Sequence, residues 1–344
     1  MTSLYGLLDA IGRSDGPFVL ATIIRTYGSA YRKAGAAMLF GRDGVRLGML
    51  SGGCLEEDLA TRANELVGSE RSHTVVYDMR SDDTRIWGID SGCNGLVEVL
   101  LEPVHPRLKA HLRMAKVCLD RGIPVTCLRR LDRERSVTGY YFAPHDGQSA
   151  FGDWTGDVPD SLRMRQAGEG LTGDMFILQR EPAEVFAQTL WPKPRLILFG
   201  AGEDARPVAA LAAKAGYSVT VADWRPAYCA ETFFPDADRL LVGSPTEIQR
   251  QLRLGRQDSA VLMSHHFDRD REMLRYLLRH ELKYVGILGP RHRTVRLLDG
   301  KPVPESVRSP AGLPIGAEGP EEIAVSIVGE LIRTFRGRPA AEGQ

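Results

Sequence analysis

The chain has 344 residues, enough for about two domains, because a single hydrophobic core usually stops growing near ~250 residues. Lysine and arginine together number 44, as do aspartate and glutamate, which excludes an overall basic surface for nucleic acid or an anionic membrane. The chain shows neither a secretory signal pattern nor an apolar stretch near the ~20 residues that cross a bilayer. The five cysteines are an odd number in a long chain, which argues against a disulfide framework. We therefore expect a cytoplasmic protein with reduced thiols.

The first half of the chain predicts a mixed α/β domain, residues 1–185. Apolar, β-branched and alternating segments predict strands, and segments with a helical period predict helices. The polar region 144–173 is rich in glycine and aspartate and receives no detailed assignment. Helices are expected over 3–12, 55–68 and 107–121, and strands over 18–26, 36–40, 73–79, 96–104, 123–129, 136–142 and 174–180.

The second half predicts a Rossmann-like domain, residues 193–338. The boundary is expected within 180–194, where three prolines interrupt the periodic pattern. Beyond it, apolar strands alternate with helices, which predicts a doubly wound parallel sheet and gives the whole chain an α/β fold class. Strands are expected over 195–200, 217–223, 237–243, 259–264 and 284–289, and helices over 203–216 and 320–337.

A dinucleotide-binding fingerprint follows the first strand of this second domain. Gly200, Gly202 and Ala205 match G-x-G-x-x-G/A between a predicted strand and a predicted helix, and Asp223 ends the next strand, where a ribose hydroxyl would bind. The two residues between Gly202 and Ala205 are acidic and would repel a phosphate at the helix start. Two interpretations stay open, a NAD(P) site and a Rossmann scaffold adapted to another ligand or to packing.

Two further groups of polar residues follow later strands of the same domain. His265 and His266 come directly after the fourth strand, at the C-terminal edge where such sheets bind ligands. Arg291 and Arg293 follow the fifth strand near a helix start and could clamp a phosphate or another anion. A solvated helix face explains the arginines equally well, and helix-start preference explains the aspartates that follow the histidines.

The cysteines divide into two kinds. Cys54 in SGGC and Cys93 in SGCNG lie in glycine-rich loops, where a thiol at a helix start is a better nucleophile or soft-metal ligand. Cys118 and Cys127 lie in an apolar helix and strand, which predicts buried structural thiols, and Cys229 fits either kind. The sequence has no C-x-x-C, H-E-x-x-H, G-x-S-x-G or Walker A motif, so the usual structural-zinc and catalytic sets are missing.

Taken together and in order, seven segments resemble the XdhC/CoxI family over about residues 15 to 335. Known members are accessory proteins that bind molybdenum cofactor and help its sulfuration and insertion into xanthine dehydrogenase-like enzymes. The resemblance implies molybdenum cofactor as cargo, a molybdenum hydroxylase as client, and a cysteine desulfurase and a second copy of the chain as further partners. The segments are RTYGSAYRKAGAAML, GMLSGGCLEEDL, WGIDSGCNGLVEVLLEPV, LILFGAGEDARPVAALAAKAGYSVTVADWRP, SHHFDRDREML, YVGILGPRHR and AGLPIGAEGPEEIAVSI.

The resemblance also implies a site. The two cysteine loops would hold the cofactor, with Cys54 and Cys93 near the molybdenum, and the Rossmann domain would form the other wall or a dimer contact. A thiolate, glycine loops and an anion clamp suit a dithiolene-bound metal, a pterin and a phosphate. Two rivals are an NAD(P)-dependent oxidoreductase and a scaffold that docks its client without holding cofactor. The candidate residues are Gly52, Gly53, Cys54, Gly92, Cys93, Asn94, Gly95, Gly200, Gly202, Asp223, His265, Arg291 and Arg293.

Overall fold

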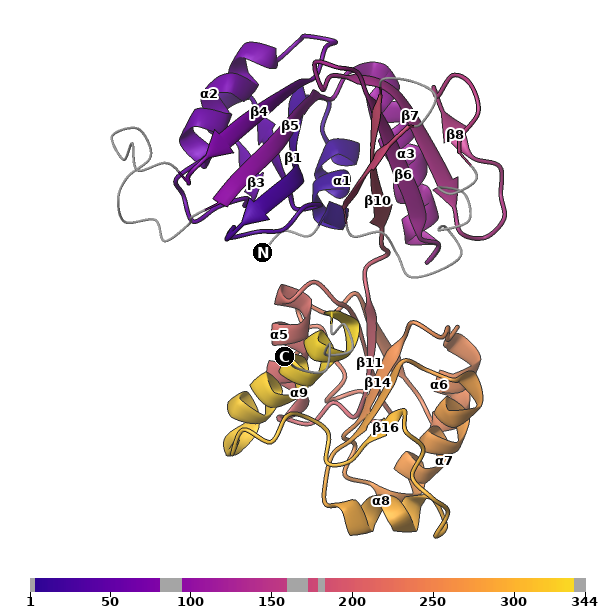
Figure 1. Cartoon of the computed structure of the whole chain (residues 1–344). Helices are drawn as coiled ribbons and strands as arrows, with labels where there is room; N and C mark the ends of the chain where they lie inside the picture. The colour runs from indigo at the N-terminus through magenta and orange to yellow at the C-terminus, as the bar shows by residue number, and fades with distance from the viewer. Residues whose placement is uncertain (1–3, 81–94, 160–172, 179–182, 337–344) are drawn as a thin grey trace. The chain divides into compact units, whose positions relative to one another are not determined.

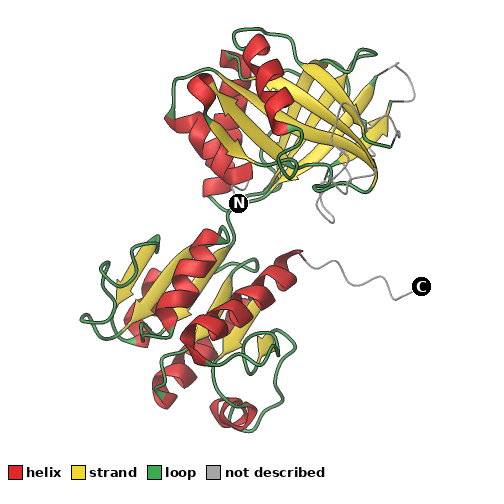
Figure 2. Ribbon diagram, turned by 90° about the vertical axis from the view of Figure 1, so that its left-hand side faces the viewer, coloured by secondary structure: helices red, strands yellow, loops and turns green. Residues whose placement is uncertain are grey.

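The structure is a computed structural model that describes residues 4–80, 95–159, 173–178 and 183–336. The chain divides into two compact units, residues 1–192 and 193–344 (Figure 1). In each unit, helices lie against the faces of β-sheets (Figure 2). None of the described helices is long and apolar enough to cross a membrane.

The described part of the first unit contains two antiparallel five-stranded sheets. The first sheet has the order β3 (Arg46–Gly48), β2 (Ala37–Gly41), β1 (Phe18–Gly28), β5 (Gly95–Pro103) and β4 (His73–Asp78). The second has the order β8 (Phe151–Gly152), β7 (Val137–Pro144), β6 (Val125–Leu131), β10 (Glu184–Leu190) and β9 (Asp174–Ile177). The accompanying helices are α1 (Leu4–Arg13), α2 (Glu56–Leu66) and α3 (Pro106–Asp120), with a short 3₁₀ turn η1 (Arg42–Gly44).

Strand β1 is buried on both faces, which explains its continuous apolar sequence. Val19 and Ile23 pack in the core that includes helix α2, whereas Leu20 packs in the core formed with α1 and α3. Ile24 packs in one small core with Phe186 of β10, a strand of the other sheet. Apolar side chains around β1 therefore connect the helices and both sheets of the first unit.

The segment 180–194, expected to hold the domain boundary, contains strand β10. The units divide after Pro192, inside this segment, but most of the segment belongs to the first unit. Val185, Phe186 and Ala187 are fully buried, and β10 pairs with β6 on one side and β9 on the other. The prolines at 192 and 194 follow the strand, where a missing N–H removes no ladder hydrogen bond. The strand was not predicted, because prolines that flank it were taken to interrupt the pattern.

The second unit is a six-stranded parallel sheet with helices on both faces. Its strand order is β13 (Arg239–Val242), β12 (Ser218–Asp223), β11 (Arg195–Phe199), β14 (Ser259–Leu262), β15 (Tyr284–Ile287) and β16 (Val307–Arg308). Helices α5 (Ala205–Lys214) and α9 (Gly319–Arg336) pack in one core, and α6 (Pro245–Gln251), α7 (Phe267–Leu277) and α8 (Arg291–Leu297) pack in the other. A second 3₁₀ turn, η3 (Leu278–His280), follows α7.

This arrangement confirms the predicted α/β fold with a Rossmann-like parallel sheet. The strand order corresponds to 3-2-1-4-5-6 along the chain, which is the order of dinucleotide-binding folds. The strand order reverses between β11 and β14, so the loops after these two strands flank the topological switch point, where such sheets bind ligands. Strand β16 was not predicted, because two residues carry no readable pattern.

Candidate functional site

Cys54 lies in the loop that connects β3 to the start of α2. Its side chain is partly exposed and lines a small cavity together with Tyr31, Arg32 and Met79. The enclosed volume is about 10 Å³, room for one water molecule at most. The cavity is therefore too small to enclose a ligand as large as a pterin.

A buried carboxylate shapes the Cys54 loop from beneath. Glu56, only 8% exposed, accepts hydrogen bonds from the Leu50 N–H at 3.1 Å, the Ser51 N–H at 2.7 Å and the Ser51 hydroxyl. The Ser51 hydroxyl oxygen in turn accepts from Gly53 and Leu55 N–H groups, each at 3.2 Å. Burial alone would raise the pKa of Glu56, but these hydrogen bonds outweigh it and lower the pKa. Glu56 is thus an ionised anchor for the loop.

The glycines around Cys54 have different roles. Gly52 and Gly53 are exposed, and a Cβ atom at either position would meet nothing within 4 Å, so the loop leaves open space beside the thiol. Gly53 also has a φ of +116°, which favours glycine. Gly95 pairs with Gly28 at the start of β5, and a Cβ there would lie 2.4 Å from the Ser29 carbonyl oxygen.

Three of the expected cofactor-binding residues, Gly92, Cys93 and Asn94, lie outside the described residues. The convergence of Cys54 and Cys93 therefore remains a prediction. Met79 and Gly95 lie in the described residues on either side of this segment. Met79 lines the Cys54 cavity, and its N–H donates a hydrogen bond to the Gly95 carbonyl oxygen at 2.9 Å.

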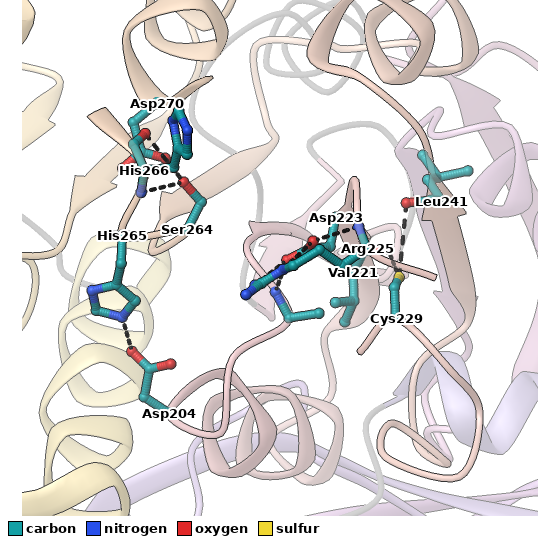
Figure 3. Close-up of polar contacts among 11 residues, drawn as sticks. Asp204, Val221, Asp223, Arg225, Cys229, Leu241, Ser264, His265, His266 and Asp270 are labelled. Carbon is teal, nitrogen blue, oxygen red and sulfur yellow. Dashed lines mark hydrogen bonds and ion pairs between the residues drawn. The ribbon is translucent and has the colours of Figure 1, made fainter. Parts of the chain in front are cut away.

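Burial raises the pKa values of the thiols outside the glycine loops. Burial raises the pKa of Cys127 to about 11 and also raises that of Cys229, whose thiol donates to the carbonyl oxygens of Val221 and Leu241 (Figure 3). Cys118 was predicted to be buried like Cys127, but it is partly exposed on helix α3, although burial still raises its pKa. Cys127 therefore fits the predicted structural role, and Cys229 belongs to the same kind.

The glycine loop of the second unit lies against the loop after β14. Gly200 has a φ of +120°, and a Cβ there would lie 2.5 Å from the carbonyl group of Met263. Such close approach of two backbones explains why the first position of the fingerprint is glycine. The structure thus brings the 200–202 loop and the His265 loop together at the switch point.

Asp223 is fully buried, and groups of its own chain occupy its carboxylate. One oxygen accepts from the Ala201 N–H at 2.7 Å, and both accept from the Arg225 guanidinium at 3.0 and 2.8 Å (Figure 3). Burial by itself would raise the pKa of Asp223, but the hydrogen bonds from Arg225 and the backbone outweigh it and lower the pKa. The residue expected to receive a ribose hydroxyl instead joins the glycine loop to Arg225.

His265 crosses the switch point to a carboxylate that follows the glycine loop. Its Nε2 lies 2.7 Å from Oδ2 of Asp204, and its backbone has a left-handed φ of 57° (Figure 3). The other carboxylate oxygen of Asp204 lies over Gly202, only 2.6 Å from where a Cβ of that glycine would be. This pair occupies the place where a bound pyrophosphate would approach the helix start.

The two arginines expected to form a clamp do not act together. Arg293 donates to the buried Asp270 at 2.7 Å, and Asp270 also accepts from the Ser264 hydroxyl. Burial is the largest influence on Asp270 and raises its pKa despite these partners. Arg291, by contrast, is exposed and lines a separate open groove of about 320 Å³. Arg293 is thus a structural residue, and Arg291 belongs to a different part of the surface.

Comparison with known proteins decides the family. Three family models match, namely the XdhC and CoxI family over residues 12–78, the BH1974-like central domain over 106–191 and the XdhC Rossmann domain over 196–331. A protein of Bacillus subtilis (strain 168), named as a probable subunit of xanthine dehydrogenase, is 42% identical over 336 residues, which is 97% of this chain and 98% of the relative. The chain belongs to the XdhC and CoxI family. The family resemblance expected from the sequence is therefore confirmed.

Two more proteins are similar to this XdhC and CoxI family member over most of its length. The molybdenum cofactor insertion chaperone PaoD of Escherichia coli (strain K12) is 25% identical over 320 residues, covering 91% of this chain and 82% of PaoD. A crystal structure described as a xanthine dehydrogenase (BH1974) from Bacillus halodurans matches with a TM-score of 0.86 at 42% identity, covering 98% of this chain and 97% of that one. The similarity thus extends through both units.

Sequence reasoning missed several residues that shape these sites in the XdhC and CoxI family protein. Glu56 reads as one of three acidic residues at a helix start, although its carboxylate is turned back into the loop. Arg225 follows Asp223 by two residues, and that short spacing was a readable signal for a local ion pair. Asp204 and His265 are 61 residues apart, and no local pattern connects them.

Proposed function

We propose that the protein is an accessory chaperone that binds molybdenum cofactor and supports its sulfuration and insertion into a xanthine dehydrogenase or aldehyde oxidase type of molybdoenzyme. The observation that carries the proposal is the Cys54 loop, which holds a partly exposed thiol at the edge of an open glycine surface. The similarity to a protein named molybdenum cofactor insertion chaperone supports the same role. In this role molybdenum cofactor is the cargo.

The chemistry of the Cys54 loop suits this cargo. A thiolate is a soft ligand of the kind that molybdenum-sulfur centres accept, and the exposed Gly52 and Gly53 leave room for a flat pterin beside it. Arg32 is one of the residues that line the cavity, and an arginine there suits an anionic phosphate. Glu56 holds the loop in this shape through its two backbone hydrogen bonds. The family resemblance assigns Cys93 to the same cofactor site.

An NAD(P)-dependent oxidoreductase is the alternative, and the geometry of the second unit supports it less. The carboxylate of Asp223 already accepts four hydrogen bonds. One comes from the Ala201 N–H, one from the Arg225 N–H and two from the Arg225 guanidinium. The Asp204–His265 pair lies at the start of α5, where a Rossmann fold would bind a pyrophosphate. A titration with NADH or NADPH tests this alternative, since micromolar binding that is lost in Asp223→Ala would favour the enzyme.

Complementation of a deletion strain tests the proposed function. The deletion strain receives the gene for the wild type, for Cys54→Ala, for Cys93→Ala or for the control Cys118→Ala. The molybdenum and sulfido content of the client hydroxylase is then measured in each strain. We expect Cys118→Ala to restore the client fully, because this partly exposed thiol lies on helix α3, away from the glycine loops. We expect Cys54→Ala and Cys93→Ala to fail. Full restoration by both loop variants would contradict the cysteine role.

The remaining expectations about location and partners belong to the same proposal. The protein would act in the cytoplasm as a homodimer that contacts the client hydroxylase and a cysteine desulfurase. Light scattering after size-exclusion chromatography measures the oligomeric state directly. Purification from cells that make molybdenum cofactor should yield protein with bound pterin and molybdenum, whereas a docking scaffold would carry neither.

A further inference from the structure

A row of stacked aromatic and cationic side chains lies at the C-terminal edge of the parallel sheet. It consists of Trp224, Arg225, Tyr228, His266 and Arg269, which we call the stacking row. The Arg225 guanidinium lies 4.6 Å from the Trp224 ring centre and 4.2 Å from that of Tyr228. Arg269 lies 4.4 Å from the Trp224 ring, and the His266 ring meets Trp224 edge-on at 5.6 Å. Planar groups from the loop after β12 and from the start of α7 thus form one surface.

The stacking row is accessible from solvent and is held in place from beneath. Tyr228 is 42% exposed, and Trp224, Arg225 and Arg269 are each at least partly exposed. Arg225 is fixed by its paired hydrogen bonds to the buried Asp223. A planar ring that stacked here would therefore meet a preorganised surface rather than mobile side chains.

This edge of the sheet also carries positive charge without a partner. Among the described residues, no carboxylate lies within ion-pair distance of Arg269, in contrast to Arg225 and Arg293, which pair with aspartates. The Arg269 guanidinium, which lies beside the Trp224 ring without such a partner, favours an anionic ligand.

The same edge disfavours a dinucleotide. Asp204 lies over Gly202 and is held there by His265, while Glu203 adds a second, exposed carboxylate to the helix start. A pyrophosphate at that position would meet two negative charges in place of free N–H groups. The hydrogen bond of Asp204 goes to His265, which is not a member of the stacking row.

We propose that the stacking row binds a nucleoside monophosphate, with the base stacked on the solvent-exposed side of the row at Tyr228 and the phosphate paired with Arg269. The Asp204–His265 pair then sets the specificity, because it excludes the pyrophosphate of NAD(P). This site goes beyond the proposed function and does not rest on it, since no residue of the Cys54 loop takes part.

Calorimetric titration of the full-length protein with AMP tests the proposal. The wild type should bind AMP at one site per chain and bind ribose 5-phosphate about tenfold more weakly, because that compound has no base to stack. Arg269→Gln should weaken AMP binding at least about tenfold by removing the phosphate partner. The matched control is Arg271→Gln on the same helix, whose guanidinium pairs with Asp268 and Asp299 and should leave AMP binding unchanged.

Two further variants separate the stacking from the specificity. Tyr228→Leu should weaken AMP binding but not ribose 5-phosphate binding, and a thermal melt checks that the variant is folded. Asp204→Ala should bind NADH more tightly than the wild type, because the carboxylate over Gly202 is gone.

Absence of AMP binding at millimolar concentration would overturn the proposal, as would equal AMP affinity in Arg269→Gln and Arg271→Gln. Tighter binding of NADH than of AMP by the wild type would also overturn it. Cys54→Ala should bind AMP like the wild type, so failure of this site and failure of the cofactor role give different results.

Discussion

Replacement of Glu56 by alanine should destabilise the first unit and loosen the Cys54 loop. Glu56 is the acceptor for the Leu50 N–H, the Ser51 N–H and the Ser51 hydroxyl, and all of these groups are buried. Hydrogen bonds to a charged group contribute about 1.5 to 3 kcal/mol each, and unsatisfied buried donors cost a similar amount. Because these terms are not additive, we expect a loss of about 3 kcal/mol in the free energy of unfolding. For a domain of this size that lowers Tm by about 6 to 12 °C.

The control is Glu57→Ala, one residue further along the same helix. The Glu57 side chain is 79% exposed and pairs with Arg46 at the surface, so its replacement should leave Tm nearly unchanged. Differential scanning calorimetry measures both variants, and the rate of Cys54 alkylation reports the loop directly. Equal Tm values for Glu56→Ala and Glu57→Ala, or unchanged alkylation in Glu56→Ala, would refute the anchoring role of Glu56.

The pH dependence of the Glu56 effect has a definite sign. Its folded pKa is lowered, so its stabilisation is fully present above the unfolded pKa, ordinarily near 4.5, and is lost as the pH falls through the lower folded value. The stability difference between the wild type and Glu56→Ala should therefore shrink in acid below about pH 4.5. Urea unfolding at a series of pH values measures it, and a difference that grows in acid would contradict the assignment.

Three further predictions concern burial and backbone geometry. Gly200→Ala should lower the free energy of unfolding of the second unit by about 3 kcal/mol, because the backbone has a φ of +120° and the new Cβ would clash with the Met263 carbonyl. The control Gly216→Ala has open space around its Cβ and should lower the same free energy by about 1 kcal/mol. Arg129→Met should cost about 3 to 5 kcal/mol by leaving Glu102 buried without its partner, and urea unfolding would show no change if that pair were dispensable. Iodoacetamide at neutral pH should modify Cys54 before Cys127 or Cys229, and peptide mass spectrometry that finds the reverse order would contradict their burial.

The predicted fold of the second unit was correct because its signals are local. Apolar strands alternate with helices, and the G-x-G-x-x-A segment links the first strand to the first helix. In the first unit, the pattern predicted most strands but not β10, since proline was taken as a boundary and the strand pairs with β6, more than fifty residues earlier. Pairing between distant strands leaves no periodic trace in either one.

The sequence by itself determined the family and the parallel sheet, because motif order and hydrophobic periodicity depend on residues close together in the chain. It also drew attention to Cys54, which the structure places at an open surface. Only the tertiary structure decided what the polar residues do. Arg225 covers Asp223, His265 reaches Asp204, and Glu56 turns back beneath the Cys54 loop. These roles depend on side-chain direction and on contacts across the fold, which residue type and spacing do not specify.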